Sequence, residues 1–281
     1  MSGRGDRRLY PHRAGVLGAG LANESETERS MSLSFNLDGK VALVTGGNTG
    51  LGQAMAIALA QAGADIVVAG RSSAAETGEA VESAGRKFYE IKADFSDPSC
   101  VEGVVATTVE QAGRIDILVN NAGIIKRNDA LDFTQDDWDS VMDVNIKSAF
   151  FLCQAAAKRM VAQGSGKIIN IASMLSFQGG IRVASYTSSK SAIAGLTKLL
   201  ANEWAAKGIN VNAIAPGYFA TNNTAALQAD PDRNEQILGR IPAGRWGDPS
   251  DIGGAAVFLS SAAADYVHGT VLAVDGGWLA R

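Results

Sequence analysis

Hydrophobic residues along this chain follow two alternating patterns from Leu37 onward. Short segments that are apolar at almost every position end at turn residues, and such segments predict strands buried on both faces. Longer segments between them carry apolar residues three and four positions apart, which predicts helices. The predicted strands are Val41–Thr45, Ile66–Ala69, Phe88–Lys92, Ile117–Asn120, Lys167–Ala172, Ile209–Ile214 and Thr270–Val274. The predicted helices lie near residues 50–62, 75–84, 99–112, 135–162, 185–207 and 250–261.

Apolar strands that are each followed by a helix predict a parallel sheet covered on both faces. The predicted fold class is therefore α/β, with a doubly wound, seven-stranded parallel sheet and helices on both sides. The chain has 281 residues and no break in composition after its first part, so we expect one domain over residues 34–281. Ligands of such sheets bind at the carboxyl ends of the strands.

Residues 1–33 differ from the rest, because they hold several arginines and glutamates but no sustained apolar period. One interpretation is a disordered N-terminal extension, or an upstream start codon with Met31 beginning the functional chain. The other is an organelle address, which the arginines favour and the glutamates disfavour.

The segment 218–245 contains Pro231 and Pro242 and shows no clear periodicity. A long irregular loop inside an α/β domain is usually functional. We therefore predict an irregular lid here that becomes ordered when ligand binds.

Composition narrows the class of protein. The net charge is −4, which disfavours a nucleic-acid partner, and no apolar run is long enough to span a membrane. The two cysteines, Cys100 and Cys153, lack metal-ligand spacing and are expected as core residues in a reducing compartment, the cytoplasm. The two histidines, His12 and His268, are too few and too misplaced for a Ser-His-Asp hydrolase, a histidine-based dehydrogenase or a histidine zinc site. We predict no metal.

A glycine-rich turn follows the first strand and opens the first helix. Glycines at this position let the backbone approach a pyrophosphate, which the N-terminus of the helix then faces. A plain strand-to-helix turn is the alternative. The predicted cofactor-binding residues of this Rossmann-type turn are Gly46, Asn48, Thr49, Gly50, Leu51 and Gly52.

The end of the second strand should select between the two nicotinamide dinucleotides. An acidic residue there would hold ribose hydroxyls, but this chain has Arg71 and Ser72, which suit a 2′-phosphate. This favours NADP(H). Alternatively, Arg71 stacks on the adenine and tolerates either cofactor.

Two further strand ends are predicted to contact the cofactor. Asp94 and Phe95 follow the third strand, where the adenine would lie. Asn121, Ala122 and Gly123 follow the fourth strand, where small residues leave room for the ribose.

Tyr186 and Lys190 are four residues apart and share one face of a predicted helix. A free tyrosine has a pKa near ~10, and lowering it to about 7 requires roughly 4 kcal/mol of preference for the phenolate. The Lys190 ammonium, together with a positively charged nicotinamide ring, could supply that in a water-poor cleft. The predicted chemistry is proton transfer by Tyr186 coupled to hydride transfer at a carbonyl carbon.

Together these residues resemble the short-chain dehydrogenase/reductase family over residues 37–281. The resemblance rests on the glycine turn, on Asn120–Gly123, and on Asn145, Ser173, Tyr186, Lys190 and Pro216–Gly217. It implies that Tyr186 is the acid/base and that Lys190 lowers its pKa and holds the nicotinamide ribose. Ser173 would bind the substrate oxygen, and Asn145 would complete a proton relay through water. It also implies that the nicotinamide carboxamide is flanked by Pro216, Gly217, Phe219 and Thr221, and that the protein is a homotetramer.

Four segments, 170–183, 215–224, 240–247 and 274–281, resemble one branch of that family. It is the branch of 2-deoxy-D-gluconate 3-dehydrogenase and 2-dehydro-3-deoxy-D-gluconate 5-dehydrogenase. The branch implies a sugar-acid substrate and is associated mainly with NAD(H). The alternatives are a gluconate 5-dehydrogenase, a 3-oxoacyl-carrier-protein reductase, or an inactive nucleotide sensor, which we would expect to have lost Tyr186 or Lys190.

A sugar acid needs hydroxyl partners and a cation for its carboxylate. The predicted substrate residues are Met174, Gln178, Arg182, Asn222 and Arg245. Arg182 is predicted to bind the carboxylate, or alternatively to brace its loop or a subunit contact. The C-terminal Trp278 and Leu279 are expected to be exposed and, with the apolar helices 135–162 and 185–207, to form a subunit interface.

Overall fold

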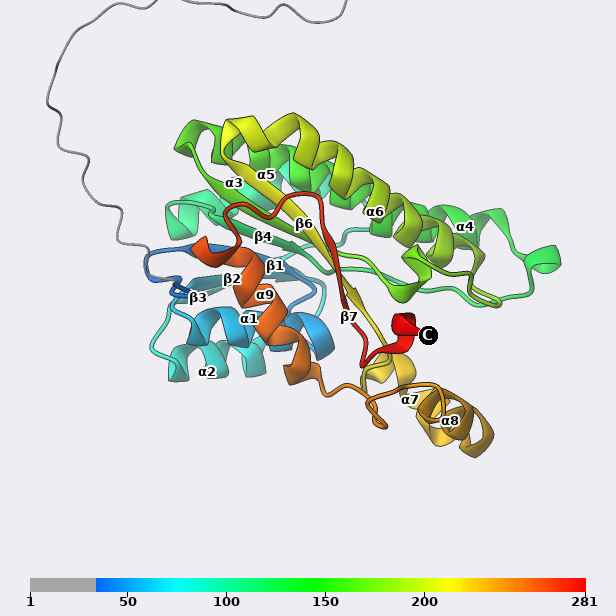
Figure 1. Cartoon of the computed structure of the whole chain (residues 1–281). Coiled ribbons are helices and arrows are strands. Elements are labelled where there is room, and N and C mark those ends of the chain that lie inside the picture. The colour runs from blue at the N-terminus through cyan, green and yellow to red at the C-terminus, as the bar shows by residue number, and fades with distance from the viewer. Residues whose placement is uncertain (1–33) are drawn as a thin grey trace, which may run out of the picture. The chain divides into compact units, whose positions relative to one another are not determined.

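The computed structural model describes residues 34–281, shown as the coloured ribbon in Figure 1. The prediction for residues 1–33 lies outside the described residues.

Within residues 34–281, seven parallel strands form one sheet in the order β3-β2-β1-β4-β5-β6-β7. The strands are β1 (Val41–Thr45), β2 (Asp65–Gly70), β3 (Phe88–Lys92), β4 (Ile117–Asn120), β5 (Gly166–Ile171), β6 (Ile209–Pro216) and β7 (Val271–Val274). The order reverses between β1 and β4, as in a Rossmann fold, so a crevice opens at their carboxyl ends. The predicted fold class is confirmed, and every predicted strand lies within two residues of an observed one.

Helices cover both faces of the sheet, as Figure 1 shows. One face carries α1 (Gly50–Gln61), α2 (Ala75–Ser83) and α9 (Gly253–Ser260), and the other carries α3 (Val101–Ala112), α5 (Ala149–Gln163) and α6 (Ala184–Trp204). In β1, Ala42 and Val44 belong to the core on the α1 side, while Val41 and Leu43 belong to the core on the α5 side. This explains why the strand is apolar at every position rather than at alternate ones.

The predicted helix 135–162 is interrupted. It consists of α4 (Gln135–Met142), a π-helical turn (Asp143–Ser148) and α5. Two polar side chains in the turn point inward, because Ser148 donates to the carbonyl of Phe95 (2.8 Å) and Asn145 bonds the backbone of Ile124. One extra residue in the turn lets both side chains reach these partners, a usual place for a π-bulge.

The expectation that 218–245 is irregular is wrong. This segment contains α7 (Ala225–Ala229) and α8 (Pro231–Leu238). The Asp230 side chain accepts hydrogen bonds from the backbone N–H groups of Asp232 and Arg233, and Pro231 occupies the first position of α8. Asp followed by Pro is thus a helix start here, not a loop signal.

The expectation that Trp278 is exposed is also wrong. Its side chain is only 5% exposed and packs with Met174, Ile237 and Ile241. The apolar C-terminus therefore packs within the subunit, and Trp278 offers little surface for association.

No helix among residues 34–281 is both long and apolar enough to cross a lipid bilayer.

Candidate active site

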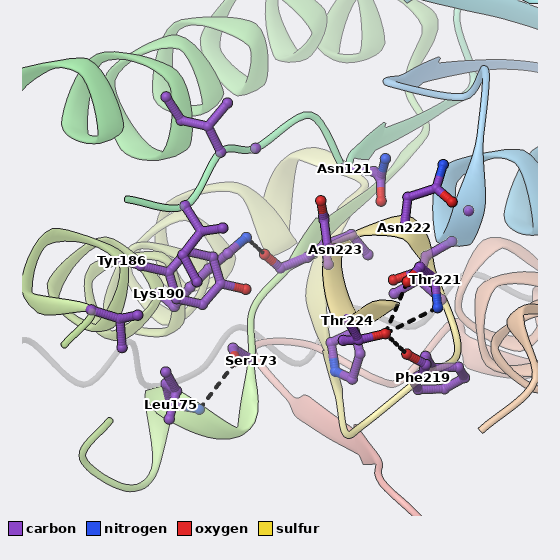
Figure 2. Close-up of a pocket in the computed structure, with 18 of the residues that line it drawn as sticks. Asn121, Ser173, Leu175, Tyr186, Lys190, Phe219, Thr221, Asn222, Asn223 and Thr224 are labelled. Carbon is purple, nitrogen blue, oxygen red and sulfur yellow. Dashed lines mark hydrogen bonds between the residues drawn. The ribbon is translucent and has the colours of Figure 1, made fainter. Parts of the chain in front are cut away.

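A cavity of about 860 Å³ lies at the carboxyl ends of the strands. Segments that follow β1, β2, β3, β4, β5 and β6 all contribute to its wall. Its volume is in the range of sites that hold a cofactor and a small substrate. Figure 2 shows part of this wall, with Ser173, Tyr186 and Lys190 facing the loop that carries Thr221 to Thr224.

The predicted cofactor-binding residues all line this cavity. They are Gly46, Asn48, Thr49, Gly50, Leu51, Gly52, Arg71, Ser72, Asp94, Phe95, Asn121, Ala122, Gly123, Tyr186, Lys190, Pro216, Gly217, Phe219 and Thr221.

The glycine turn is tied to the loop after β4. The Asn121 side-chain amide donates to the carbonyls of Thr45 (3.0 Å) and Gly46 (3.1 Å). In return, the Thr45 hydroxyl accepts from the backbone N–H groups of Asn121 (3.0 Å) and Ala122 (2.9 Å). These bonds hold the ends of β1 and β4 together at the point where the strand order reverses.

The turn has the shape needed for a pyrophosphate. Gly46 has φ +63°, in the left-handed region, and a Cβ on Gly52 would collide with the Gly46 carbonyl oxygen and the Asn121 amide. Thr49, at the N-cap of α1, makes no side-chain capping bond. The N–H groups of the first turn of α1 therefore have no cap from this side chain, which suits an anionic ligand.

The far end of the cavity carries a cation and a carboxylate. Arg71 lies after β2, and Asp94 lies after β3. Hydrogen bonds from the backbone and hydroxyl of Ser96 hold the pKa of Asp94 below its usual value, and the charge of Arg71 adds to this. Since Asp94 is already engaged by Ser96, the Arg71 guanidinium can serve a ligand phosphate.

Tyr186 and Ser173 line the cavity together. Ser173 ends the backbone of β5, and its hydroxyl accepts from the N–H of Leu175 (3.1 Å). Burial of the phenol raises the pKa of Tyr186 above its ordinary value, and the Ser173 hydroxyl and the charge of Arg127 oppose this only in part. Without another positive charge nearby, Tyr186 is a neutral phenol at neutral pH.

Lys190 is buried one helical turn beyond Tyr186. Its ammonium donates to the carbonyl of Ile171 and lies 5.7 Å from the centroid of the Tyr186 ring. Burial lowers the pKa of Lys190 to about 8, so the side chain is still mainly cationic at neutral pH. The protein's own groups thus do not lower the Tyr186 pKa toward 7, and the predicted lowering would depend on the nicotinamide charge.

Asn145 lies behind the cavity wall rather than on it. Its carbonyl oxygen accepts from the N–H of Ile124 (2.8 Å), and its amide donates to the Ile124 carbonyl (2.9 Å) and the Ser189 hydroxyl (3.1 Å). It therefore joins the loop after β4 to α6, the helix of Tyr186.

The substrate residues divide into two groups. Met174, Gln178 and Asn222 line the cavity, as predicted. Arg182 and Arg245 do not line it, and for these two the structure contradicts the prediction.

Each misplaced arginine has a carboxylate partner. The Arg182 Nε lies 3.2 Å from the Asp129 carboxylate, and the Arg182 carbonyl accepts from the N–H of Asn128 (3.0 Å). Arg182 therefore braces its loop against the loop after β4. Arg245 donates through Nη2 to Asp251 (3.0 Å), which leads into α9. Nearness in sequence to Tyr186 or to the lid did not predict which way these side chains point.

Three cavity cations were missed, namely Arg127, Arg233 and Arg240. Arg127 lies four residues after Gly123, so the strand-end argument could have found it. Arg233 and Arg240 come from α8 and the turn after it, and no signal in the sequence aims them at the cavity. Among residues 34–281, no group of three or more His, Cys, Asp or Glu side chains could hold a metal ion.

Comparison with known proteins gives a consistent set of relatives. The family model described as enoyl-(acyl carrier protein) reductase matches residues 46–279. The 2-dehydro-3-deoxy-D-gluconate 5-dehydrogenase of Dickeya dadantii is 61% identical over 249 residues, which cover 88% of this chain and 98% of that protein. The enzyme of the same name from Bacillus subtilis is 58% identical over 249 residues, with the same coverage.

Solved structures agree with these relatives. An Agrobacterium tumefaciens protein with bound NADP, assigned provisionally as a 2-deoxy-D-gluconate 3-dehydrogenase, is 61% identical with a TM-score of 0.84, covering 89% of this chain and 100% of that one. A Burkholderia cenocepacia gluconate 5-dehydrogenase in complex with NADP and tartrate is 41% identical with a TM-score of 0.85, covering 89% of this chain and 98% of that one.

The glycine turn can be tested with Gly52→Ala. The added methyl group would displace the Gly46 carbonyl, so we expect NADP(H) and NAD(H) to bind about tenfold more weakly or worse. Titration of NADPH and NADH fluorescence measures this, with a melting temperature to show that the variant is folded. The control is Gly254→Ala, because a Cβ on this helical glycine of α9 would meet nothing within 4 Å. Unchanged binding in folded Gly52→Ala would refute the assignment.

The ionisation of Tyr186 gives a second test. The difference in phenolate absorbance between the wild type and Tyr186→Phe, recorded against pH, reports this phenol alone. Because burial favours the neutral form, we expect a pKa above the ordinary value of about 10 in the protein without ligand. With saturating NADP⁺ we expect the pKa to fall, since a nearby positive charge favours the phenolate. A pKa already near 7 without ligand would contradict this.

Proposed function

This chain belongs to the short-chain dehydrogenase/reductase family, and on that basis we propose that it oxidises or reduces a sugar acid of the 2-dehydro-3-deoxy-D-gluconate type with NAD(P). One observation carries the proposal. Ser173, Tyr186 and Lys190 line the same cavity as a glycine turn shaped for a dinucleotide, in a chain 61% identical to an enzyme of that name over 98% of its length.

NAD(P), when bound, supplies the hydride acceptor or donor. In our proposal, the turn from Gly46 to Gly52 holds the pyrophosphate. Arg71 and Ser72 hold the adenosine end, beside Asp94 and Phe95, and Asn121 to Gly123 lie along the ribose. Pro216, Gly217, Phe219 and Thr221 flank the nicotinamide, and Lys190 holds its ribose. The Lys190 ammonium has three donors, of which the Ile171 carbonyl takes one, so two remain for hydroxyl groups.

Tyr186 is the proposed acid/base. It takes the hydroxyl proton when the alcohol is oxidised and returns it when the keto group is reduced. Ser173 holds the reacting oxygen beside the phenol, and its interaction with Tyr186 already favours the phenolate. The contacts of Asn145 support a positioning role, because they fix the loop after β4 relative to the helix of Tyr186; a relay through water would add to this role.

We assign NADP(H) as the preferred cofactor. Arg71 and Ser72 supply a cation and a hydroxyl at the end of β2, and neither side chain is replaced by a carboxylate that would repel a 2′-phosphate. Bound NADP in the Agrobacterium and Burkholderia proteins supports the same choice.

The lining of the cavity favours a sugar acid over an acyl chain. A 3-oxoacyl-carrier-protein reductase needs an apolar channel, whereas this cavity presents Arg127, Arg233, Arg240 and Gln178. Gluconate 5-dehydrogenase activity remains the second candidate, since the Burkholderia enzyme has that name and a TM-score of 0.85.

Three further assignments accompany the proposal. The segment 218–245 acts as a lid, supported by the cavity-facing side chains of Asn222 and Arg233. The protein forms a homotetramer, supported by exposed apolar side chains on α5 and α6, such as Phe151 (42% exposed) and Leu199 (49%). It works in the cytoplasm, where the free thiols of Cys100 and Cys153 would stay reduced.

The function is tested by nicotinamide absorbance. Purified protein with 2-dehydro-3-deoxy-D-gluconate, and separately with D-gluconate, is assayed with each cofactor. We expect turnover of the first substrate to exceed that of the second, and Tyr186→Phe to lose about a thousandfold in kcat while still binding NADPH. Turnover of gluconate alone would favour the second candidate. Turnover of neither, by a protein that binds NADPH, would overturn the sugar-acid assignment.

Cofactor choice is tested with Arg71→Ala. Loss of a charge-assisted bond to the 2′-phosphate should lower kcat/KM for NADP⁺ by about tenfold to a hundredfold and leave that for NAD⁺ nearly unchanged. Lys92→Ala is the control, because Lys92 is a nearby cation that pairs with Glu90 and does not line the cavity. Equal losses with both cofactors would indicate that Arg71 stacks on the adenine instead.

A further inference from the structure

One wall of the cavity is built from three side chains that are far apart in the sequence. Gln178 follows β5, Arg240 follows α8, and Trp278 lies in the C-terminal turn, and all three line the cavity. The Gln178 side-chain oxygen accepts from both Arg240 Nη2 (3.3 Å) and Trp278 Nε1 (3.2 Å). The Arg240 guanidinium also lies 4.0 Å from the centroid of the Trp278 ring. The three side chains thus form one connected unit, which we call the Arg240–Trp278–Gln178 cluster.

The cluster is held in place from behind. The Asp275 carboxylate accepts from the N–H groups of Gly277 (2.9 Å) and Leu279 (2.8 Å), which fixes the turn that carries Trp278. The Tyr218 ring packs edge-on against Trp278, with centroids 4.8 Å apart. Because Tyr218 follows Pro216 and Gly217, the cluster is packed directly onto the segment that we assign to the nicotinamide. Figure 1 shows the C-terminus beside α7 at this end of the sheet.

The cluster offers donors without a protein acceptor to satisfy them. Arg240 has no carboxylate within ion-pair distance among residues 34–281, whereas Arg182 and Arg245 each have one. The Gln178 amide nitrogen likewise donates to no acceptor in the part of the chain that the structure describes. A planar guanidinium and an amide NH₂ on one wall match the two oxygens of a carboxylate.

The other two cavity arginines fit this role less well. The charge of Arg127 acts on the Tyr186 phenol, which places Arg127 at the reacting end of the cavity. In a sugar acid that reacts at carbon 5, the carboxylate is four bonds away, or about 5 Å along an extended chain. The Arg233 guanidinium donates to Gln236 (2.9 Å) on the exposed side of its own helix. Only Arg240 is both stacked on an aromatic ring and bonded to a second cavity residue.

We propose that Arg240, oriented by Trp278 and Gln178, binds the carboxylate of the sugar acid, so that the last residues of the chain form part of the substrate site. This inference rests on the proposed function. It assigns to Arg240 the role that the sequence suggested for Arg182. Stacking lowers the entropy cost of holding the guanidinium for a ligand. Trp278 is a positioning residue, because it acts through Arg240.

The test compares two ligands that differ only in charge. D-Gluconate and the neutral D-gluconamide are used as competitive inhibitors of 2-dehydro-3-deoxy-D-gluconate turnover, next to the KM and kcat of that substrate. Arg240→Met keeps an unbranched side chain over Trp278 and removes the charge. We expect it to raise the KM and the gluconate inhibition constant by about tenfold or more, with the gluconamide constant and kcat changed by less than about threefold.

Four variants serve as comparisons. Arg240→Lys retains the charge without the planar fork and should fall between the wild type and Arg240→Met. Trp278→Leu should raise the KM with kcat largely kept. Arg127→Met tests the rival cation. Arg159→Met removes an exposed arginine of α5 that does not line the cavity, and it should behave as the wild type.

The outcomes separate the two proposals. If the wild type turns over no sugar acid, the proposed function fails and this inference fails with it. If the wild type is active but Arg240→Met weakens gluconate and gluconamide equally, only this inference fails. It also fails if Arg127→Met shows the charge-selective loss and Arg240→Met does not.

Discussion

The tie between the ends of β1 and β4 is the constraint on which the rest of the site depends. Thr45 and Asn121 exchange four hydrogen bonds across the point where the strand order reverses. These bonds close the glycine turn over the N-terminus of α1 and set the start of the loop that carries Arg127. A parallel sheet leaves its strand ends to be joined by side chains or loops, and here that join is also the floor of the cavity.

Burial sets the chemistry of the proposed acid/base pair. The same apolar surroundings raise the pKa of Tyr186 and lower that of Lys190 to about 8, so both groups are pushed toward their neutral forms. Arg127 and Ser173 counter this at the phenol. The protein alone thus holds a neutral tyrosine beside a cationic lysine. A cofactor charge is then needed to reach the phenolate, which would couple proton transfer to cofactor binding.

Polar side chains buried behind the wall hold it in shape. Asn145 links the loop after β4 to α6, and the π-helical turn that carries it brings both of its amide atoms to Ile124. At the other end, the C-terminal turn packs Trp278 against the lid residues Ile237 and Ile241. The cavity is therefore enclosed by segments from both ends of the described chain, and movement of the lid must alter the packing of the C-terminus.

The sequence by itself determined the fold, the glycine turn and the set of Ser173, Tyr186 and Lys190. These features depend on short-range patterns: apolar runs for buried strands, glycines where a Cβ would collide, and a four-residue step on one helix face. It did not determine side-chain direction in irregular backbone. Arg182 adopts a left-handed φ of +62° and pairs with Asp129, while Arg240 reaches the cavity through Trp278, some 40 positions away in the sequence. Such contacts form only when distant segments pack together, so the tertiary structure alone decided which arginine faces the cavity.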